Sequence, residues 1–263
     1  QGVRNWQRKL RKKQKRLRSQ SETSEEISKE DETKDETTIE ETTQVQSTTA
    51  VNTSDDKDEY PGVKKVYLTF DDGPSSITSD ILDVLDCYGV KATFFTVCNT
   101  SESAIQNMQR IVNSGHTIAI HSVSHKYSTV YASPEATLNE YNYTEDAIRK
   151  ALGNSSYISK LFRFPGGSNG GYYDEAKQNS KALLHDNGIM HLDWNSLSSD
   201  AAGAKTKEAL LQNVKDTMGE KDSVVILMHD SSDKILTYEM LSDLISYLRE
   251  QGYKFENIYD LLD

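Results

Sequence analysis

The stretch Val66-Tyr67-Leu68-Thr69-Phe70-Asp71-Asp72-Gly73-Pro74 is an apolar, β-branched and aromatic run that ends in two acids and a Gly-Pro turn. Apolar residues on both sides of the run predict a strand buried on both faces, as in a parallel sheet. Gly73 and Pro74 stop the strand where the next helix must begin. Because neighbours on extended backbone point to opposite sides, we expect one carboxylate to face a bound ion and the other to face water or substrate. The alternative is a turn that only caps the following helix.

Helices and strands alternate outward from this stretch over residues 61–263. After the first strand, the hydrophobic spacing predicts helices at 79–88, 103–114, 133–152, 174–186, 205–218 and 236–250, and strands at 90–97, 117–120, 161–163, 189–194, 223–228 and 253–255. Ser79 is expected to cap the first helix. Such alternation implies parallel pairing through right-handed crossovers, and roughly seven units favour an α/β barrel over an open sheet. Functional residues of such a barrel lie at the carboxyl ends of its strands.

The charge is distributed unevenly along the chain. Residues 1–20 carry nine basic side chains and no acid, whereas residues 21–60 carry fourteen acids and three bases. Few large apolar side chains lie in 1–60, so we expect a disordered charged spacer before one folded domain at 61–263. The formal charge of the whole chain is −11, and the acidic domain argues against a nucleic-acid partner. The basic run 8–18 is interpreted either as a solvated tail or as a contact for anionic wall polymers or lipid head groups.

Targeting and redox signals are few. The chain starts at Gln1, and no stretch approaches the apolar length that spans a membrane. We expect a processed or partial form of an extracellular or cell-envelope protein, with any signal peptide or membrane anchor upstream of Gln1. The predicted helix and strand place Cys87 and Cys98 near opposite ends of these elements, so no disulfide is expected between them.

Two histidines follow the third predicted strand with a spacing that suits a metal. His121 and His125 are four residues apart, so on a helical turn or in a tight loop both imidazoles can face one point. Together with Asp72 from a neighbouring strand end, they form a set of two histidines and one carboxylate for a divalent ion with open positions. Such an ion lowers the pKa of bound water and polarises a carbonyl. The alternative is a histidine pair in an ordinary surface turn.

Hydrolysis of an acyl group also needs a base and an acid. Asp71 suits the base and His229 suits the acid, because each follows a predicted strand beside the metal set. We expect Arg163 to keep Asp71 ionised through a charge-assisted hydrogen bond, and Asp200 to raise the basicity of His229 and fix its tautomer. Two alternatives stay open: a surface ion pair for Arg163 and a helix cap for Asp200.

The order of these motifs resembles that of the polysaccharide deacetylases, also called the NodB-homology domain or carbohydrate esterase family 4. The matching motifs are Thr-Phe-Asp-Asp-Gly-Pro at 69–74, His-Ser-x-x-His at 121–125, Arg-Phe-Pro-Gly-Gly at 163–167, Asp200, and Leu-Met-His at 227–229. The resemblance covers about residues 61–263 and implies a distorted (β/α)7 barrel. It also implies removal of N-acetyl groups from an N-acetylglucosamine polymer with one divalent metal. Zinc is favoured, and cobalt, manganese or nickel are alternatives.

The family roles carry over residue by residue. The resemblance implies that Asp71 is the base and His229 the acid, that Asp72, His121 and His125 bind metal, that Arg163 and Asp200 support the base and the acid, and that the Gly166 N–H helps to hold the oxyanion. The family often has an aromatic residue in place of Gly166 and a Trp in place of Ala201. The apolar wall for the acetyl methyl group is then either supplied elsewhere, for instance by Trp194 or Leu227, or missing.

The interpretation that follows is a metal-dependent deacetylase of peptidoglycan N-acetylglucosamine at the bacterial surface, working as a monomer. One alternative is an O-acetyl esterase that acts on xylan or another acetylated glycan, because the same attack by water serves esters. Another is a glycan-binding barrel without catalysis. The intact set of base, acid and metal residues speaks against that second alternative.

Overall fold

The computed structural model describes residues 62–261, with side chains as far as Tyr259. These residues belong to one compact unit of the chain. The predictions for residues 1–60 lie outside the described residues. Among the helices of 62–261, none combines the length and the apolar composition that crossing a membrane requires. Cys87 and Cys98 are free thiols, as predicted.

The described residues form an eight-stranded sheet in which every pairing is parallel. Its order is β5-β4-β3-β2-β1-β7-β6, and β8 pairs with β1. The strands are β1 (Lys65–Asp71), β2 (Thr93–Val97), β3 (Thr117–Ser122), β4 (Leu161–Phe162), β5 (Met190–His191), β6 (Ser196–Leu197), β7 (Ser223–His229) and β8 (Lys254–Phe255). The sheet curves into a half-barrel, so the predicted distorted α/β barrel is confirmed.

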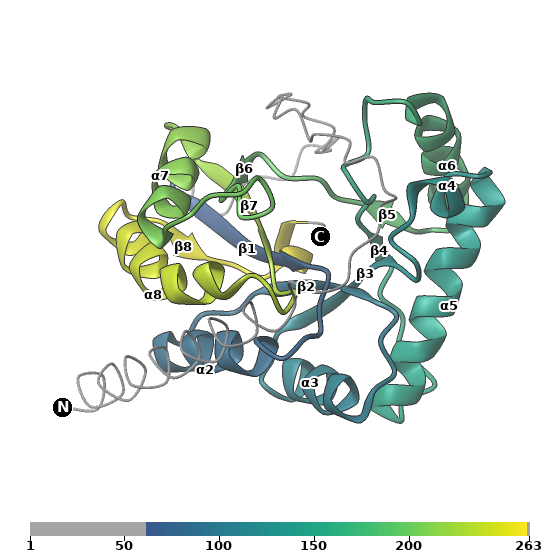
Figure 1. Ribbon diagram of the computed structural model, residues 1–263, viewed down its shortest axis with the longest axis horizontal. Coiled ribbons are helices and arrows are strands. Elements are labelled where there is room, and N and C mark those ends of the chain that lie inside the picture. The colour runs from purple at the N-terminus through teal and green to yellow at the C-terminus, as the bar shows by residue number, and fades with distance from the viewer. Residues whose placement is uncertain (1–61, 262–263) are drawn as a thin grey trace, which may run out of the picture. The chain divides into compact units, whose positions relative to one another are not determined.

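Helices cover the outside of the half-barrel (Figure 1). They are α2 (Thr78–Tyr88), α3 (Glu102–Asn113), α4 (Tyr127–Val130), α5 (Pro134–Leu152), α6 (Asp174–Asp186), α7 (Lys207–Met218) and α8 (Ile235–Glu250). The 3-10 helix η1 (Ile258–Leu261) instead packs on the inner side, where Ile258 belongs to the interior core. In the view of Figure 1, α2 and α3 lie below the strands, α5 and α6 to the right, and α7 and α8 to the left. The hydroxyls of Ser101, Ser133 and Thr206 cap α3, α5 and α7 by accepting hydrogen bonds from backbone N–H groups.

Several predicted boundaries differ from the structure: β3, for example, extends to Ser122, so His121 lies in the strand and does not follow it. The first helix starts at Thr78, and Ser79 lies inside it and does not cap it. Instead, the Thr78 hydroxyl accepts a hydrogen bond from the Ser75 N–H at 2.8 Å, which ties the turn to the first residue of the helix. The predicted strand 90–97 begins only at Thr93.

The predicted strand 189–194 is also wrong, because the chain there changes partners. Backbone N–H groups bond first to β4, from Leu192 to the Phe162 carbonyl at 3.1 Å, and then to β7, from Asn195 to the Val225 carbonyl at 3.1 Å. The segment therefore crosses from β4 to β7 and forms two short strands, β5 and β6, which are the two ends of the strand order. Hydrophobic pattern alone does not reveal such a change of partner.

On the interior face of the sheet, apolar core residues lie along the strands and polar residues lie at the carboxyl ends of the strands. The interior core is a cluster of buried side chains: Tyr67, Phe95, Ala119, Leu161, Leu192, Val225 and Ile258. Side chains alternate along a strand, so residues two and four positions further on lie on the same face. On β1 these are Thr69 and Asp71, and on β7 they are Leu227 and His229. The core thus supports the candidate site at the carboxyl ends of the strands.

Candidate active site

Asp72, His121 and His125 converge on one point. One ligand atom from each lies within 4.8 Å of the others. The Asp72 Oδ1 atom is 3.6 Å from the His121 Nε2 atom and 3.5 Å from the His125 Nε2 atom. This oxygen is buried and accepts no hydrogen bond from the described residues. A buried carboxylate oxygen that faces two imidazole nitrogens fits a divalent cation, as the sequence predicts.

His121 is prepared as a neutral ligand. Its Nδ1 atom lies 2.8 Å from the Arg163 carbonyl oxygen, so Nδ1 donates its proton there and Nε2 keeps its lone pair. Burial lowers the pKa of His121 to about 3, although the Asp72 carboxylate acts in the opposite direction. The imidazole is therefore unprotonated at neutral pH, as metal binding requires.

His125 lies in a loop rather than on a helical turn. Its backbone φ is 51°, and its N–H donates to the Ser122 hydroxyl at 3.0 Å. The Glu140 carboxylate of α5 accepts hydrogen bonds from the N–H groups of Val123 and Ser124, at 2.7 and 2.9 Å. This largely buried carboxylate fixes the loop that carries the histidine.

Asp72 has left the strand, which corrects one prediction. β1 ends at Asp71, and Asp72 has a φ of 74°, in the left-handed region. The two carboxylates consequently do not face opposite sides: Asp71 Oδ2 and Asp72 Oδ1 lie 3.8 and 3.6 Å from the same His121 nitrogen. The next residue is Gly73, where a Cβ atom would collide with the Asp230 carboxylate.

Arg163 is buried and pairs with Asp71, so the surface ion pair is excluded. Its side chain is fully buried, and its NH1 group donates to Asp71 Oδ1 at 2.9 Å and to the Thr69 hydroxyl at 2.7 Å. The guanidinium lies 3.9 Å from the centroid of the Phe95 ring. Burial raises the pKa of Asp71, and the nearby Arg163 charge opposes that rise. The guanidinium thus favours the ionised form that a base requires.

His229 pairs with Asp200, which excludes the helix cap. The Asp200 carboxylate accepts hydrogen bonds from the His229 Nδ1 at 2.7 Å and from the His229 backbone N–H at 2.8 Å. The Thr237 hydroxyl of α8 also donates to it, at 2.6 Å. Burial by itself lowers the pKa of His229, but the hydrogen bond and charge of Asp200, together with Asp71 and Asp72, raise it to about 9. The imidazole is therefore protonated at neutral pH.

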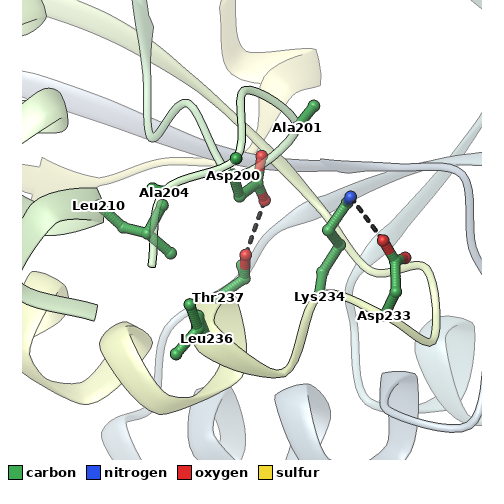
Figure 2. Close-up of a pocket in the computed structure, with 9 residues that line it drawn as sticks. Asp200, Ala201, Ala204, Leu210, Asp233, Lys234, Leu236 and Thr237 are labelled. Carbon is green, nitrogen blue, oxygen red and sulfur yellow. Dashed lines mark hydrogen bonds and ion pairs between the residues drawn. The ribbon is translucent and has the colours of Figure 1, made fainter. Parts of the chain in front are cut away.

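A cavity of about 200 Å³ lies beside Asp200. Figure 2 shows the Asp200 carboxylate pointing toward Thr237, with Ala201 and Ala204 on the same loop as Asp200. The apolar side chains of Leu210 and Leu236 are part of its lining.

The three residues expected at the substrate lie around the same rim. The Trp194 ring lies 5.7 Å from the Arg163 guanidinium, and a Cβ atom at Gly167 would meet it at 3.4 Å. Leu227 is buried and lies two residues before His229 on β7, so both face the interior of the half-barrel. Its register partner on β1 is Thr69. Gly166 is exposed at a φ of 72°. Their contacts with substrate remain predictions.

Several supporting residues are missing from the sequence prediction. Thr69, Glu140 and Thr237 orient the arginine, the histidine loop and the acid pair, while Asp230 contacts Gly73 and accepts a hydrogen bond from the Thr78 hydroxyl at 2.6 Å. Burial raises the pKa of Asp230 to about 7. Thr69 and Asp230 carry a sequence signal, since Thr69 opens the motif at 69–74 and Asp230 follows His229 directly at a strand end. Glu140 and Thr237 lie on α5 and α8, whose packing against the site no local pattern records.

The chain is similar in sequence and fold to known proteins. The family model described as polysaccharide deacetylase matches residues 58–187. The chain is 34% identical over 205 residues to the putative polysaccharide deacetylase YheN of Bacillus subtilis, covering 76% of this chain and 69% of that protein. It is 32% identical over 203 residues to a peptidoglycan-N-acetylglucosamine deacetylase of Bacillus cereus, covering 75% and 70%.

Two further similarities concern fold and substrate. The solved catalytic domain of a peptidoglycan N-acetylglucosamine deacetylase from Eubacterium rectale matches with a TM-score of 0.67 and 35% identity, covering 75% of this chain and 90% of that domain. A bifunctional xylanase/deacetylase of Pseudobutyrivibrio xylanivorans is 34% identical over 201 residues, which are 76% of this chain but only 31% of that protein. Fold, motifs and relatives agree, and the chain belongs to the polysaccharide deacetylase family.

Proposed function

We propose that this protein removes N-acetyl groups from N-acetylglucosamine residues of peptidoglycan in a metal-dependent hydrolysis. The observation that carries the proposal is the convergence of Asp72, His121 and His125 beside Asp71 and His229. A binding module would need neither a buried base with its own arginine nor a protonated imidazole with its own carboxylate.

The three converging side chains would hold one divalent ion, for which zinc suits the two imidazoles and one carboxylate, with cobalt, manganese or nickel as alternatives. When bound, such an ion supplies a Lewis acid that lowers the pKa of water and polarises the acetyl carbonyl. Asp71, favoured in its ionised form by Arg163, accepts the proton of the attacking water. His229 donates its proton to the departing amine nitrogen, because its pKa of about 9 keeps it protonated at neutral pH. The backbone N–H of Gly166, an exposed residue, is proposed to stabilise the oxyanion.

The proposed substrate follows from two kinds of support. Similar proteins include a peptidoglycan-N-acetylglucosamine deacetylase and the catalytic domain of another. Peptidoglycan lies outside the cytoplasmic membrane, so the proposal includes an extracellular or cell-envelope location. A monomer is sufficient, since the described residues of one chain supply metal ligands, base and acid together.

Acetate release is the direct test. Purified protein is incubated with intact muropeptides, chitin oligomers and acetylxylan, before and after chelation, and zinc, cobalt, manganese or nickel is then added back. We expect release from muropeptides that chelation abolishes and added metal restores. Undiminished release by the verified metal-free protein would disprove metal dependence.

An O-acetyl esterase acting on xylan is the second candidate. The similarity to the bifunctional xylanase/deacetylase favours it. In the same assay this candidate predicts acetate from acetylxylan and none from muropeptides or chitin oligomers.

A further inference from the structure

A group of four tyrosines starts beside the metal site and reaches the surface. This tyrosine cluster comprises Tyr127, the first residue of α4, Tyr131, which directly follows α4, and Tyr172 and Tyr173, which precede α6. The Tyr127 ring centroid lies 6.1 Å from that of the predicted metal ligand His125 and 6.4 Å from that of Tyr173, and the Tyr172 and Tyr173 centroids are 5.0 Å apart. Aromatic contacts therefore lead without a break from a metal ligand to the protein surface.

Tyr131 anchors the cluster in the core. It is 3% exposed, and its hydroxyl donates to the Pro165 carbonyl at 2.5 Å. Its ring stacks on Phe164 at 6.1 Å, and the Lys177 ammonium lies 5.3 Å from its centroid. Both Tyr127 and Tyr173 pack against this fixed ring, at 5.8 and 5.6 Å. The rings of Tyr127 and Tyr173 are consequently held in place before any ligand binds, which lowers the entropic cost of binding.

Tyr127 occupies the space that a side chain at position 166 would need. A Cβ atom on Gly166 would collide with the Tyr127 hydroxyl and come within 2.9 Å of its ring carbon Cζ. Tyr127 is half-buried, between the exposed His125 and the exposed Gly166. The inner end of the cluster thus lies between a predicted metal ligand and the backbone predicted to hold the oxyanion.

Tyr172 marks the outer end and has no evident folding role. It is 92% exposed and follows two glycines with positive φ, at Gly170 and Gly171. Burial of an aromatic side chain normally removes about 150–250 Å² from water, and this ring forgoes nearly all of that stabilisation. A flat ring left in solvent at the end of a fixed aromatic cluster is available to a ligand.

We propose that the tyrosine cluster is a subsite that binds the glycan chain beyond the reacting sugar, with Tyr172 stacking on a pyranose ring. The proposal rests on the proposed function, since it assigns the substrate polymer to this surface. One face of a pyranose exposes C–H groups, which are attracted to the negative face of an aromatic ring, while tyrosine hydroxyls suit the sugar hydroxyls at its edge. Continuity with the metal site favours the glycan strand over a stem peptide as the occupant.

The test compares substrates that do and do not reach the cluster. Tyr172→Ala is assayed on N-acetylglucosamine oligomers of increasing length and on a small chromogenic acetyl ester. We expect KM for the long oligomers to rise about 2- to 10-fold, the effect of one lost aromatic contact, with no change for the ester. Tyr172→Phe keeps the ring and should bind like the wild type. Tyr143→Ala, which removes a 68% exposed tyrosine of α5 outside the cluster, is the matched control.

A binding measurement separates this proposal from the proposed function. The oligomers are titrated calorimetrically into Asp71→Asn, with and without Tyr172→Ala, so that no turnover is needed. Weaker binding of the double variant supports the subsite even if the protein released no acetate. The proposal would be overturned if Tyr172→Ala had the same KM as Tyr143→Ala and if adding Tyr172→Ala to Asp71→Asn left the affinity unchanged. A loss seen only with stem-bearing muropeptides, and absent with chitin oligomers, would assign the surface to peptide and also overturn it.

Discussion

Asp71 and His229 are register partners on the neighbouring parallel strands β1 and β7. Partner strands lie about 4.8 Å apart, so the proposed base and the proposed acid project from adjacent points of one rigid sheet. Each has its own charged support: Arg163 donates to Asp71, and Asp200 accepts from His229. Arg163 thus favours the ionised form of Asp71 and Asp200 the protonated form of His229, the division of roles that acid–base catalysis needs.

Substitutions of the two adjacent acids, Asp71 and Asp72, are expected to have different effects on turnover and on metal binding. Asp71→Asn should retain metal and lose at least about 100-fold in kcat, because an amide cannot accept the proton from water. Asp72→Ala should lose metal affinity, because it removes the carboxylate that faces both imidazoles. Metal content by plasma mass spectrometry, together with acetate release at saturating zinc, distinguishes the two variants.

Tyr143→Ala serves as the control for handling and metal loading, since its exposed side chain lies outside the site. Normal turnover by Asp71→Asn would show that another group is the base. Full metal content in Asp72→Ala would remove this carboxylate from the ligand set.

The pH dependence should report the His229–Asp200 pair. The pKa of His229 is raised to about 9, so the acid is protonated below that pH and activity should fall as pH rises through it. Asp200→Asn removes the largest of the influences that raise this pKa and leaves burial, which lowers it, so the alkaline limb of kcat/KM should move to lower pH by at least about one unit. Thr237→Val removes only one hydrogen bond to Asp200 and should shift the limb less.

Metal occupancy is measured at each pH, so that a fall in activity caused by loss of the ion is distinguished from one caused by deprotonation of His229. The same raised pKa contributes stability that is complete below the unfolded value of about 6.5 and is lost as pH rises toward 9. An alkaline limb that is identical in wild type and Asp200→Asn would exclude His229 as the acid.

The sequence predicts which functional residues stand at the strand ends better than it predicts the backbone conformation and strand pairing of the segments that connect the strands. Asp71, His121 and His229 end or follow apolar runs, and parallel strands bring such positions together, so the site could be predicted without the structure. The left-handed turn at Asp72 could not, because it depends on Gly73 meeting Asp230, which lies more than 150 residues away. The pattern over 189–194 also gives no sign that its partner changes from β4 to β7.

Breaking the buried Arg163–Asp71 pair should cost stability as well as activity. Arg163→Met leaves a carboxylate that is 3% exposed without its counter-charge, and such losses cost about 3–5 kcal/mol. The free energy of unfolding, from urea titration of the metal-free protein, should fall by about that amount. The double variant Arg163→Met with Asp71→Asn should be more stable than the two single losses predict together, because no unpaired charge remains. Strict additivity would show that the pair does not interact.

Gly73→Ala should damage the metal site through a collision with Asp230. The added methyl group would meet the Asp230 carboxylate, which is buried and hydrogen-bonded to Thr78, so the turn that carries Asp72 must move. We expect zinc affinity to fall at least about 10-fold, because a displaced turn no longer presents Oδ1 to both imidazoles. Gly89→Ala is the matched control: its φ is +61° and nothing lies within 4 Å of the added atom, so it should cost about 1 kcal/mol of stability and leave zinc affinity unchanged. Equal zinc affinity in both variants, measured by competition with a chromogenic chelator, would show that Asp72 is positioned independently of the contact between Gly73 and Asp230.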